Sequence, residues 1–210
     1  MSESSQKDSQ EEEKWRVAVR RDGESDAKLV SRFLSRLHAD LDKSGVEATN
    51  ALADRGDRAR LRRCKKLEDV LFTPLFFDVR NKLSELGYGV SRGHADSATT
   101  DRDLRLACAL GLVAWVDTND GSKSFSRQLA RKREEGGDAK LSGLRFRRLL
   151  EIEDRDSLFR KMISVVRLLD KKKINVRSLA EHVYSWSPET GNWVRRRWAE
   201  DYYTSARQEP

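Results

Sequence analysis

The chain has 210 residues, of which 37% are hydrophobic and 37% are charged, and its formal net charge is +7. This length suffices for one large domain or two small ones with a buried core. No stretch approaches the ~20 apolar residues that span a bilayer, which argues against a membrane protein. The sequence has only three prolines and few runs of β-branched residues, so it predicts an all-helical fold.

The first 24 residues contain few apolar side chains, and we expect a mobile acidic tail there. They lack the apolar region of a signal peptide. The two cysteines, Cys64 and Cys108, lie among apolar helical positions and cannot form a metal cage or a disulfide framework. Reduced core thiols and a cytoplasmic protein are the resulting expectations.

An N-terminal helical domain is predicted over residues 25–120. Its first helix begins at Ser25 or Asp26 and carries apolar residues at every fourth position. Thr73 followed by Pro74 predicts the start of another helix, because proline is tolerated in the first turn. A polar loop is expected at 87–99, and a capping box that starts at Thr100 predicts a long apolar helix at the centre of this half.

Segment 55–66 is strongly basic, with seven Lys and Arg in twelve residues. If Asp57 caps a helix here, Arg58 and Arg62 share one of its faces. Such a helix repels itself unless something compensates its charge. Acidic neighbours such as Glu68 or a bound phosphate chain would both serve, and the sequence leaves both readings open.

The positive excess lies entirely in the second half of the chain. Residues 1–121 carry 21 Lys and Arg against 22 Asp and Glu, whereas residues 122–210 carry 21 against 13. We therefore predict a basic C-terminal helical bundle over 121–206. A charge of this sign attracts a polyanion but does not identify it.

Three helices are predicted between Ser124 and Leu169, joined by a Gly-Gly turn and an acidic turn. Arg127 and Arg131 share one face of the first helix, and Arg145 and Arg148 share one face of the second. Apolar residues at helical spacing occupy the opposite faces. A helix that packs on one side and exposes guanidinium groups on the other suits the phosphates of a polyanion, and equally suits water.

Two more helices are predicted after this region. Asn175 caps the first, which Ser187 and the following proline end. The second runs from about Thr190 to Ser205 with a buried stripe at steps of four. Its three consecutive arginines at 195–197 spread over roughly 200° of the helix and cannot all face one partner. Trp193, beside them, is the tryptophan that we consider for an interface.

Catalytic motifs do not occur in the sequence. The three histidines, His38, His94 and His182, are scattered without metal-ligand spacing. The acidic runs are typical of solvated surfaces, and the chain has no Walker loop, GxGxxG, GxSxG or HExxH motif. We therefore expect neither an enzyme nor a bound cofactor or metal.

The order of motifs in the second half is specific: SRQLAR, then LRFRRLLEIEDRDSLFRKMISVVRLL, then INVRSLAEHVYSW, then VRRRWAEDYY. This succession resembles the CasB family, the small subunit of the type I-E CRISPR interference complex, Cascade. The resemblance covers residues 100–205. It thins toward the N-terminus, where RLRRC and LFTPLFFDV are its counterparts, and the acidic tail and the 87–99 loop depart from it.

The resemblance implies an all-helical, non-catalytic protein with an N-terminal helical region and a C-terminal bundle. It implies binding of nucleic acid without sequence specificity, which holds the target and displaced DNA strands and stabilises the R-loop in antiviral defence. The implied partners are guide RNA and target DNA within Cascade, the backbone subunits, the large subunit and a second copy of this chain, with no membrane.

The basic residues that match the family's motifs are the expected nucleic-acid contacts, and each could instead pair with a nearby carboxylate. They are Arg62, Arg63, Arg127, Arg145, Arg148, Arg160, Arg195 and Arg196, with Arg131, Arg105 and Lys140 as weaker candidates. Two alternative functions remain open at this point. One is a helical transcription regulator with a helix-turn-helix, and the other is an adaptor whose basic half meets an acidic protein.

Overall fold

The computed structural model describes residues 25–43, 52–89, 96–130, 139, 141–169, 173–187 and 192–208. Within these ranges the chain forms ten helices and no strand, which confirms the predicted all-helical fold. The helices are α2 (Asp26–Asp40), α3 (Arg55–Arg63), α4 (Leu67–Leu71), α5 (Pro74–Glu85), α6 (Asp96–Val113), α7 (Phe125–Leu129), α8 (Gly143–Leu150), α9 (Arg155–Leu168), α10 (Val176–Tyr184) and α11 (Asn192–Gln208). The predicted N-terminal tail, His94, Arg131 and Lys140 lie outside the described residues.

Several helix starts are those that the sequence predicts. The Thr73 hydroxyl accepts the backbone N–H of Phe76 at 3.3 Å, which caps α5. The Asn175 side chain accepts the N–H of Ser178 at 2.9 Å, which caps α10. In each case a short polar side chain satisfies a backbone donor that the first turn of a helix leaves unpaired.

Two predicted starts are wrong. Asp54 caps α3 instead of Asp57, because its carboxylate accepts the Asp57 N–H at 2.8 Å while the Asp57 carboxylate accepts the Asp54 N–H at 3.3 Å. This reciprocal pair is a capping box, in which Asp57 is the third helical residue. In addition, α6 already begins at Asp96, so Thr100 lies within the helix and the loop before it is shorter than 87–99.

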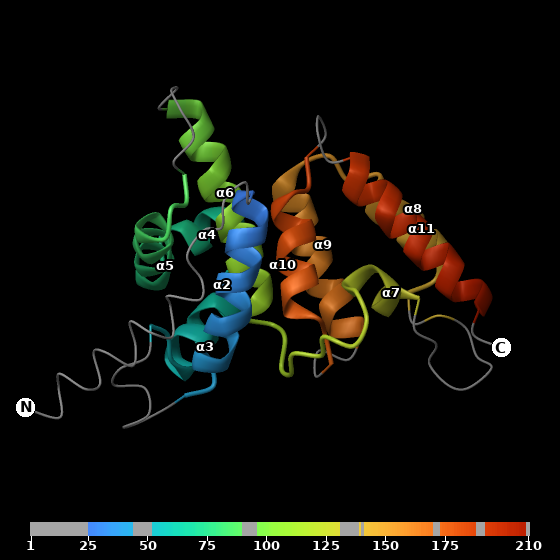
Figure 1. Cartoon of the computed structure of the whole chain (residues 1–210), viewed down its shortest axis with the longest axis horizontal. Helices are drawn as coiled ribbons and strands as arrows, with labels where there is room; N and C mark the ends of the chain where they lie inside the picture. Colours follow the sequence, from blue (N-terminus) through green and yellow to red (C-terminus); the bar gives the residue numbers. More distant parts are fainter. Residues whose placement is uncertain are drawn as a thin grey trace, which may run out of the picture.

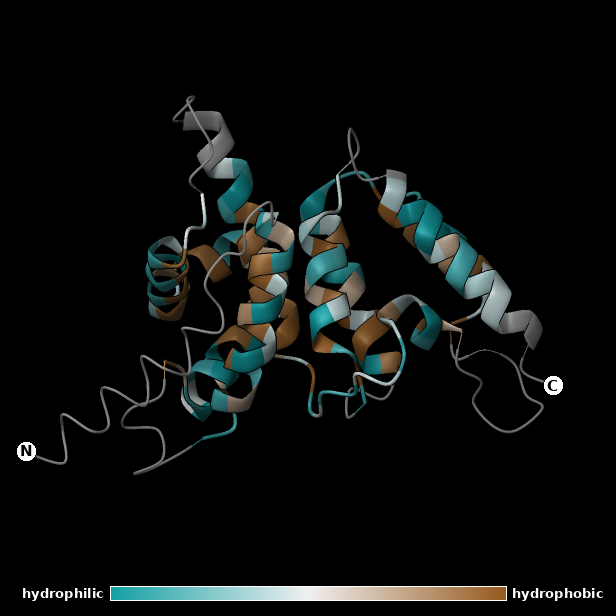
Figure 2. Cartoon of the chain, viewed as in Figure 1, coloured by the Kyte–Doolittle hydropathy of each residue, from teal (hydrophilic) through white to brown (hydrophobic). Residues whose placement is uncertain are grey.

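Helices α2, α6, α9 and α10 pack together at the centre of the molecule (Figure 1). Their apolar faces belong to one hydrophobic core that extends from Leu29 in α2 to Tyr202 in α11, and the brown stripes in Figure 2 mark these faces. The boundary that we predict near residue 120 lies between α6 and α7, and helices from both sides of it pack on each other. A division into two separate domains remains a prediction.

The two cysteines are free and buried, as the sequence predicts. Cys64 follows α3, and Cys108 lies inside α6. In the part of the chain that the structure describes, no helix combines the length and the apolar character needed to cross a bilayer.

Candidate nucleic-acid interface

Helix α8 exposes its arginines because its apolar side is anchored in the core. Phe146 is buried and stacks on Tyr202 of α11, with ring centroids 4.0 Å apart and an interplanar angle of 10°. Arg145 and Arg148 are exposed, as their spacing predicts, and so is Arg147 between them. The helix therefore holds three guanidinium groups toward solvent on a fixed backbone.

Helix α7 is joined to α11 through the carboxylate of Asp201. This group accepts hydrogen bonds from the hydroxyls of Ser126 at 2.5 Å and Ser124 at 3.1 Å, and from Nε of Arg127 at 3.4 Å. Burial would raise the pKa of Asp201, but these hydrogen bonds outweigh it and hold the pKa below its ordinary value. Asp201 therefore stays ionised and orients Arg127, whose side chain is still 59% exposed.

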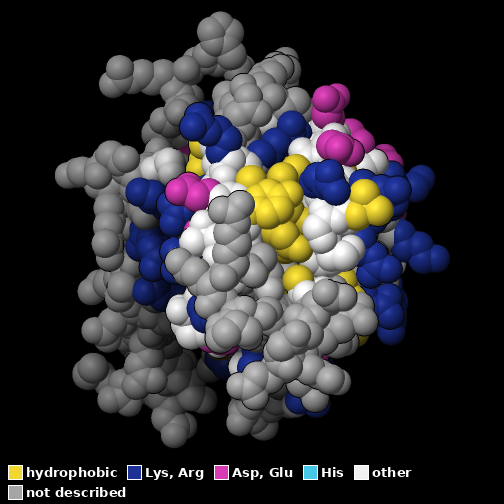
Figure 3. Space-filling model, turned by 90° about the vertical axis from the view of Figure 1, so that its right-hand side faces the viewer, with side chains coloured by type: hydrophobic (Ala, Val, Ile, Leu, Met, Phe, Trp, Pro, Cys, Tyr) yellow, Lys and Arg dark blue, Asp and Glu magenta, His cyan; other side chains and the backbone are white. Residues whose placement is uncertain are grey.

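Figure 3 looks onto the side of the molecule where α7, α8 and α11 lie. Lysine and arginine side chains, with some acidic side chains among them, lie near a group of exposed apolar side chains on this side. Leu144 of α8 and Tyr203 of α11 are among the exposed large hydrophobic residues of these helices. A surface with cations around apolar groups can contact both the phosphates and the sugars or bases of a nucleic acid.

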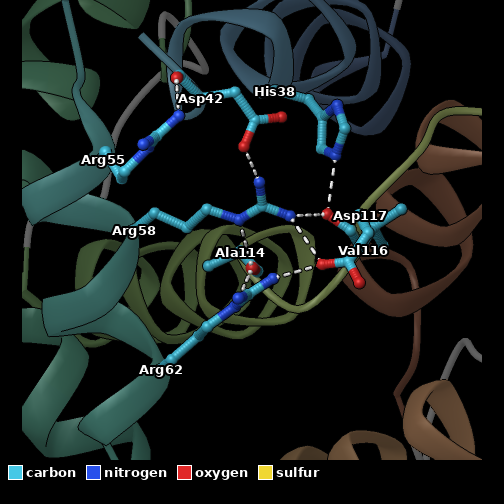
Figure 4. Close-up of polar contacts among 8 residues, drawn as sticks. All are labelled: His38, Asp42, Arg55, Arg58, Arg62, Ala114, Val116 and Asp117. Carbon is cyan, nitrogen blue, oxygen red and sulfur yellow. Dashed lines mark hydrogen bonds and ion pairs between the residues drawn. The ribbon is translucent and has the colours of Figure 1, made fainter. Parts of the chain in front are cut away.

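Arg62 and its neighbour Arg58 are engaged within the protein (Figure 4). Nε of Arg62 donates to the carbonyl of Ala114 at 2.7 Å, and its guanidinium pairs with Asp117 at 2.6 Å. Arg58 is buried and bonds to Asp42, Asp117 and the same carbonyl. These groups compensate the two arginines where the sequence suggested Glu68 or a bound phosphate chain.

Other predicted arginines also have contacts within the chain. Arg195 donates to the carbonyl of Ile152 at 2.7 Å, and its guanidinium lies 5.2 Å from the centre of the Trp186 ring. Arg160 is exposed on α9 and pairs with Asp156 one turn away. Arg105 pairs with Asp101 at 2.6 Å on α6. A contact of this kind reduces the charge that each side chain offers to a partner.

The exposed candidates lie in three places, one of which is Arg160 on α9. Arg127, Arg145, Arg148 and Arg196 are exposed on α7, α8 and α11, and both α7 and α8 contact α11. Arg63 is exposed on α3, which lies at the opposite end of the molecule from α8 (Figure 1). The structure therefore places four of the predicted arginines on three neighbouring helices.

Sequence reasoning missed Arg147 as a candidate. Its position in α8 lies between the two predicted arginines, and the narrow buried stripe of Phe146 and Leu149 leaves it exposed. The narrow apolar stripe could have predicted this exposure from the sequence. Two buried residues in an eight-residue helix leave most of the helix surface exposed to solvent.

Both histidines that the structure describes have polar contacts within the protein. Nε2 of His38 lies 2.8 Å from the carbonyl oxygen of Val116, and Nδ1 of His182 accepts a hydrogen bond from Nε1 of Trp198 at 2.9 Å. Among the residues that the structure describes, no three His, Cys, Asp or Glu side chains gather to hold a metal ion.

A family model described as CRISPR-associated protein Cse2 matches residues 57–203 of the chain. The chain belongs to the Cse2 family. The match confirms the resemblance to CasB. Family membership supports a place among the subunits of the CRISPR Cascade complex.

The fold is similar to that of a solved CasB structure. The crystal structure of CasB from Thermobifida fusca superposes with a TM-score of 0.60 at 15% sequence identity. The alignment covers 85% of this chain and 97% of that chain. At this identity the likeness shows the fold alone. No curated protein sequence matches the chain.

Proposed function

We propose that this Cse2-family protein is a non-catalytic subunit that binds nucleic acid without sequence specificity and stabilises the R-loop of Cascade. The observation that carries the proposal is the exposure of Arg145 and Arg148 on a helix that the stack of Phe146 on Tyr202 holds in place. Planar guanidinium groups bind phosphate oxygens well, and phosphate contacts carry no sequence information. Arg127 and Arg196 are further exposed cations on the neighbouring helices α7 and α11.

The role follows from how RNA-guided complexes divide recognition. Base pairing between guide and target reads the sequence, while the protein holds backbones and the displaced strand. The guide RNA and the target DNA are therefore the proposed ligands, in the cytoplasm. Backbone subunits, the large subunit and a second copy of this chain are the proposed protein partners.

The structure gives less support to a helix-turn-helix regulator. Its recognition helix would have to be α3, the short basic helix of the first half. Arg58 and Arg62 of that helix bond to Ala114 and Asp117 and are not directed at a DNA groove. A recognition helix needs side chains that reach base edges.

The proposal is tested by DNA binding of the full chain, measured by fluorescence anisotropy over a range of salt concentrations. We expect Arg145→Glu with Arg148→Glu to weaken binding to single- and double-stranded DNA roughly 10-fold or more. The slope of log affinity against log salt should fall by about 1.4 for single strands, the value for two lost phosphate contacts. The melting temperature should barely move, because both side chains are exposed.

A matched variant separates a local site from a change in net charge. Lys28→Glu with Lys82→Glu makes the same change in charge on α2 and α5, which are distant from α8 (Figure 1). We expect this control to bind nearly as well as the unmodified protein. If both variants lose the same amount of DNA affinity, the loss is due to the change in net charge. If the α8 variant binds DNA as tightly as the unmodified protein, the assigned site is wrong.

A further inference from the structure

A pocket of about 320 Å³ opens between α10 and the first turns of α11. Its lining combines cations, a carboxylate, an imidazole and an indole: Arg177, Glu181, His182, Trp193 and Arg197, with Asn175 at the start of α10. None of these six residues is among the basic residues that the sequence predicts as nucleic-acid contacts. A concave site with a few convergent polar groups is the usual form of a small-ligand site.

Trp193 differs from the other tryptophans of this region. Trp186 and Trp198 are buried in the core, whereas Trp193 is 47% exposed. It is held on one side by a T-shaped contact with His182, with ring centroids 6.0 Å apart and an interplanar angle of 79°. An indole that is positioned and still open to solvent can stack on a nucleobase, an interaction of about 1–3 kcal/mol per base.

The charged groups of the pocket suit a nucleotide better than a bare phosphate. Arg177 and Arg197 are exposed cations that can bind phosphate oxygens. Glu181 lies in the same lining, and its carboxylate would repel an isolated phosphate. The same carboxylate can accept hydrogen bonds from the N–H groups on the edge of a base.

His182 supplies a donor for such a base. Its Nδ1 accepts the N–H of Trp198, so Nδ1 carries no proton. Burial lowers the pKa of His182 to about 4, and the ring is neutral at physiological pH. The proton of the neutral imidazole therefore lies on Nε2, where it can be donated to a ring nitrogen or carbonyl of a base.

The pocket adjoins Arg127, one of the exposed predicted arginines. Ser124 lines it and donates to Asp201, and Nε of Arg197 lies 3.9 Å from the same carboxylate. Asp201 also pairs with Arg127 at 3.4 Å. A strand whose phosphates follow Arg127 would therefore meet the pocket next.

We propose that this pocket binds one unpaired nucleotide of a single strand, with its base stacked on Trp193 and its flanking phosphates on Arg177 and Arg197. This inference rests on the proposed function, because it assigns a base-binding position to a surface that otherwise contacts phosphates. Phosphate contacts alone bind strands with and without exposed bases equally well. The proposed pocket would favour a strand that has exposed bases.

The test compares two single strands of about 12 nucleotides, a length within the usual range of single-strand sites. One strand is ordinary DNA and the other is an abasic deoxyribose-phosphate chain. We expect Trp193→Ala in the full chain to bind ordinary DNA about 10-fold more weakly and the abasic strand unchanged. Trp193→Phe keeps an aromatic ring and should bind like the unmodified protein. Phe72→Ala removes a 74% exposed ring from the end of α4 and should have no effect.

Four other results would contradict the pocket assignment, and each has a different meaning. If the unmodified protein binds both strands equally and Trp193→Ala changes neither affinity, the pocket proposal fails while the proposed function stands. Equal losses on both strands would also refute base stacking. Loss of binding to other Cascade subunits with unchanged DNA affinity would assign the pocket to a protein partner. If the unmodified protein binds neither strand, the proposed function fails and the pocket assignment fails with it.

Discussion

Nε of Arg58 donates a hydrogen bond to the carbonyl oxygen of Ala114 at 3.1 Å. Ala114 directly follows α6, where the last carbonyls of a helix have no partner within it. A cation is also favourable at this negative end of the helix dipole. The same guanidinium bonds to Asp42 and Asp117 (Figure 4). This buried side chain, together with Arg62, joins α3 to the end of α6.

Arg58→Ala should lower the free energy of unfolding by about 2–3 kcal/mol, measured by urea denaturation. The loss arises because the fold loses a buried guanidinium that bonds to Asp42, Asp117 and the carbonyls of Ala114 and Val116. Arg62 keeps its own bonds to Ala114 and Asp117 in this variant. Arg60→Ala is the control, since Arg60 is 54% exposed and makes one surface pair with Asp57. That variant should lose less than about 1 kcal/mol. Similar losses in both variants would contradict a structural role for the buried position.

Gly111→Ala should destabilise the fold by about 1–2 kcal/mol in the same measurement. A Cβ atom at this position of α6 would lie 2.8 Å from a ring carbon of Phe159 and 3.1 Å from Val70, both buried. The clash exceeds the gain of roughly 1 kcal/mol that alanine brings to a helix. Gly143→Ala in α8 has no atom within 4 Å of its Cβ and should be neutral or slightly stabilising. Stabilisation by both variants would show that α6 and α9 are less closely packed than described.

His182 should make stability depend on pH. Burial lowers its pKa to about 4 from 6.5, and Arg197 adds to this shift while Asp201 opposes it. The unfolded chain therefore takes up the proton first as the pH falls. The contribution is complete above pH 6.5 and decreases toward pH 4, by up to about 3 kcal/mol.

The variant His182→Asn keeps an acceptor for Trp198 and removes the titrating group. Urea denaturation between pH 7 and pH 4 should show a smaller decrease in stability than in the unmodified protein. Some decrease should remain, because burial also lowers the pKa of His38. An unchanged pH profile in the variant would contradict this assignment.

Much of the fold could be predicted from local sequence. The apolar spacing of Phe146 and Leu149, and the caps at Thr73 and Asn175, report interactions within one or two turns of a helix. Such patterns are visible in a sequence because both partners lie in the same short segment. The outward position of Arg145 and Arg148 followed from the same logic.

The fate of the basic segment 55–66 could not be predicted in this way. Its charge suggested a phosphate partner, but Arg58 and Arg62 bond to groups at the end of α6, more than 50 residues along the chain. Arg195 likewise reaches the carbonyl of Ile152 from another helix. Whether an arginine faces solvent or a distant carbonyl depends on tertiary packing, which charge and periodicity do not report.

The capping of α3 and α6 shows a second limit. Asp54 and Asp57 are both good capping residues, and only the reciprocal geometry of the box identifies Asp54 as the first. Thr100 has a capping pattern, yet α6 extends past it to Asp96. A capping pattern in the sequence does not mark the start of a helix when the preceding residues can also adopt helical geometry.

The central claim is that the arginines of α8 hold nucleic acid in Cascade, and the lifetime of the R-loop in the assembled complex tests it most directly. Cascade should assemble equally well with the unmodified protein and with the variant Arg145→Glu with Arg148→Glu, because both residues are exposed on α8. The R-loop of the variant complex should dissociate roughly 10-fold faster at physiological salt, with a weaker salt dependence. An R-loop lifetime equal to that of the unmodified complex, with the variant subunit present at full occupancy, would contradict the account.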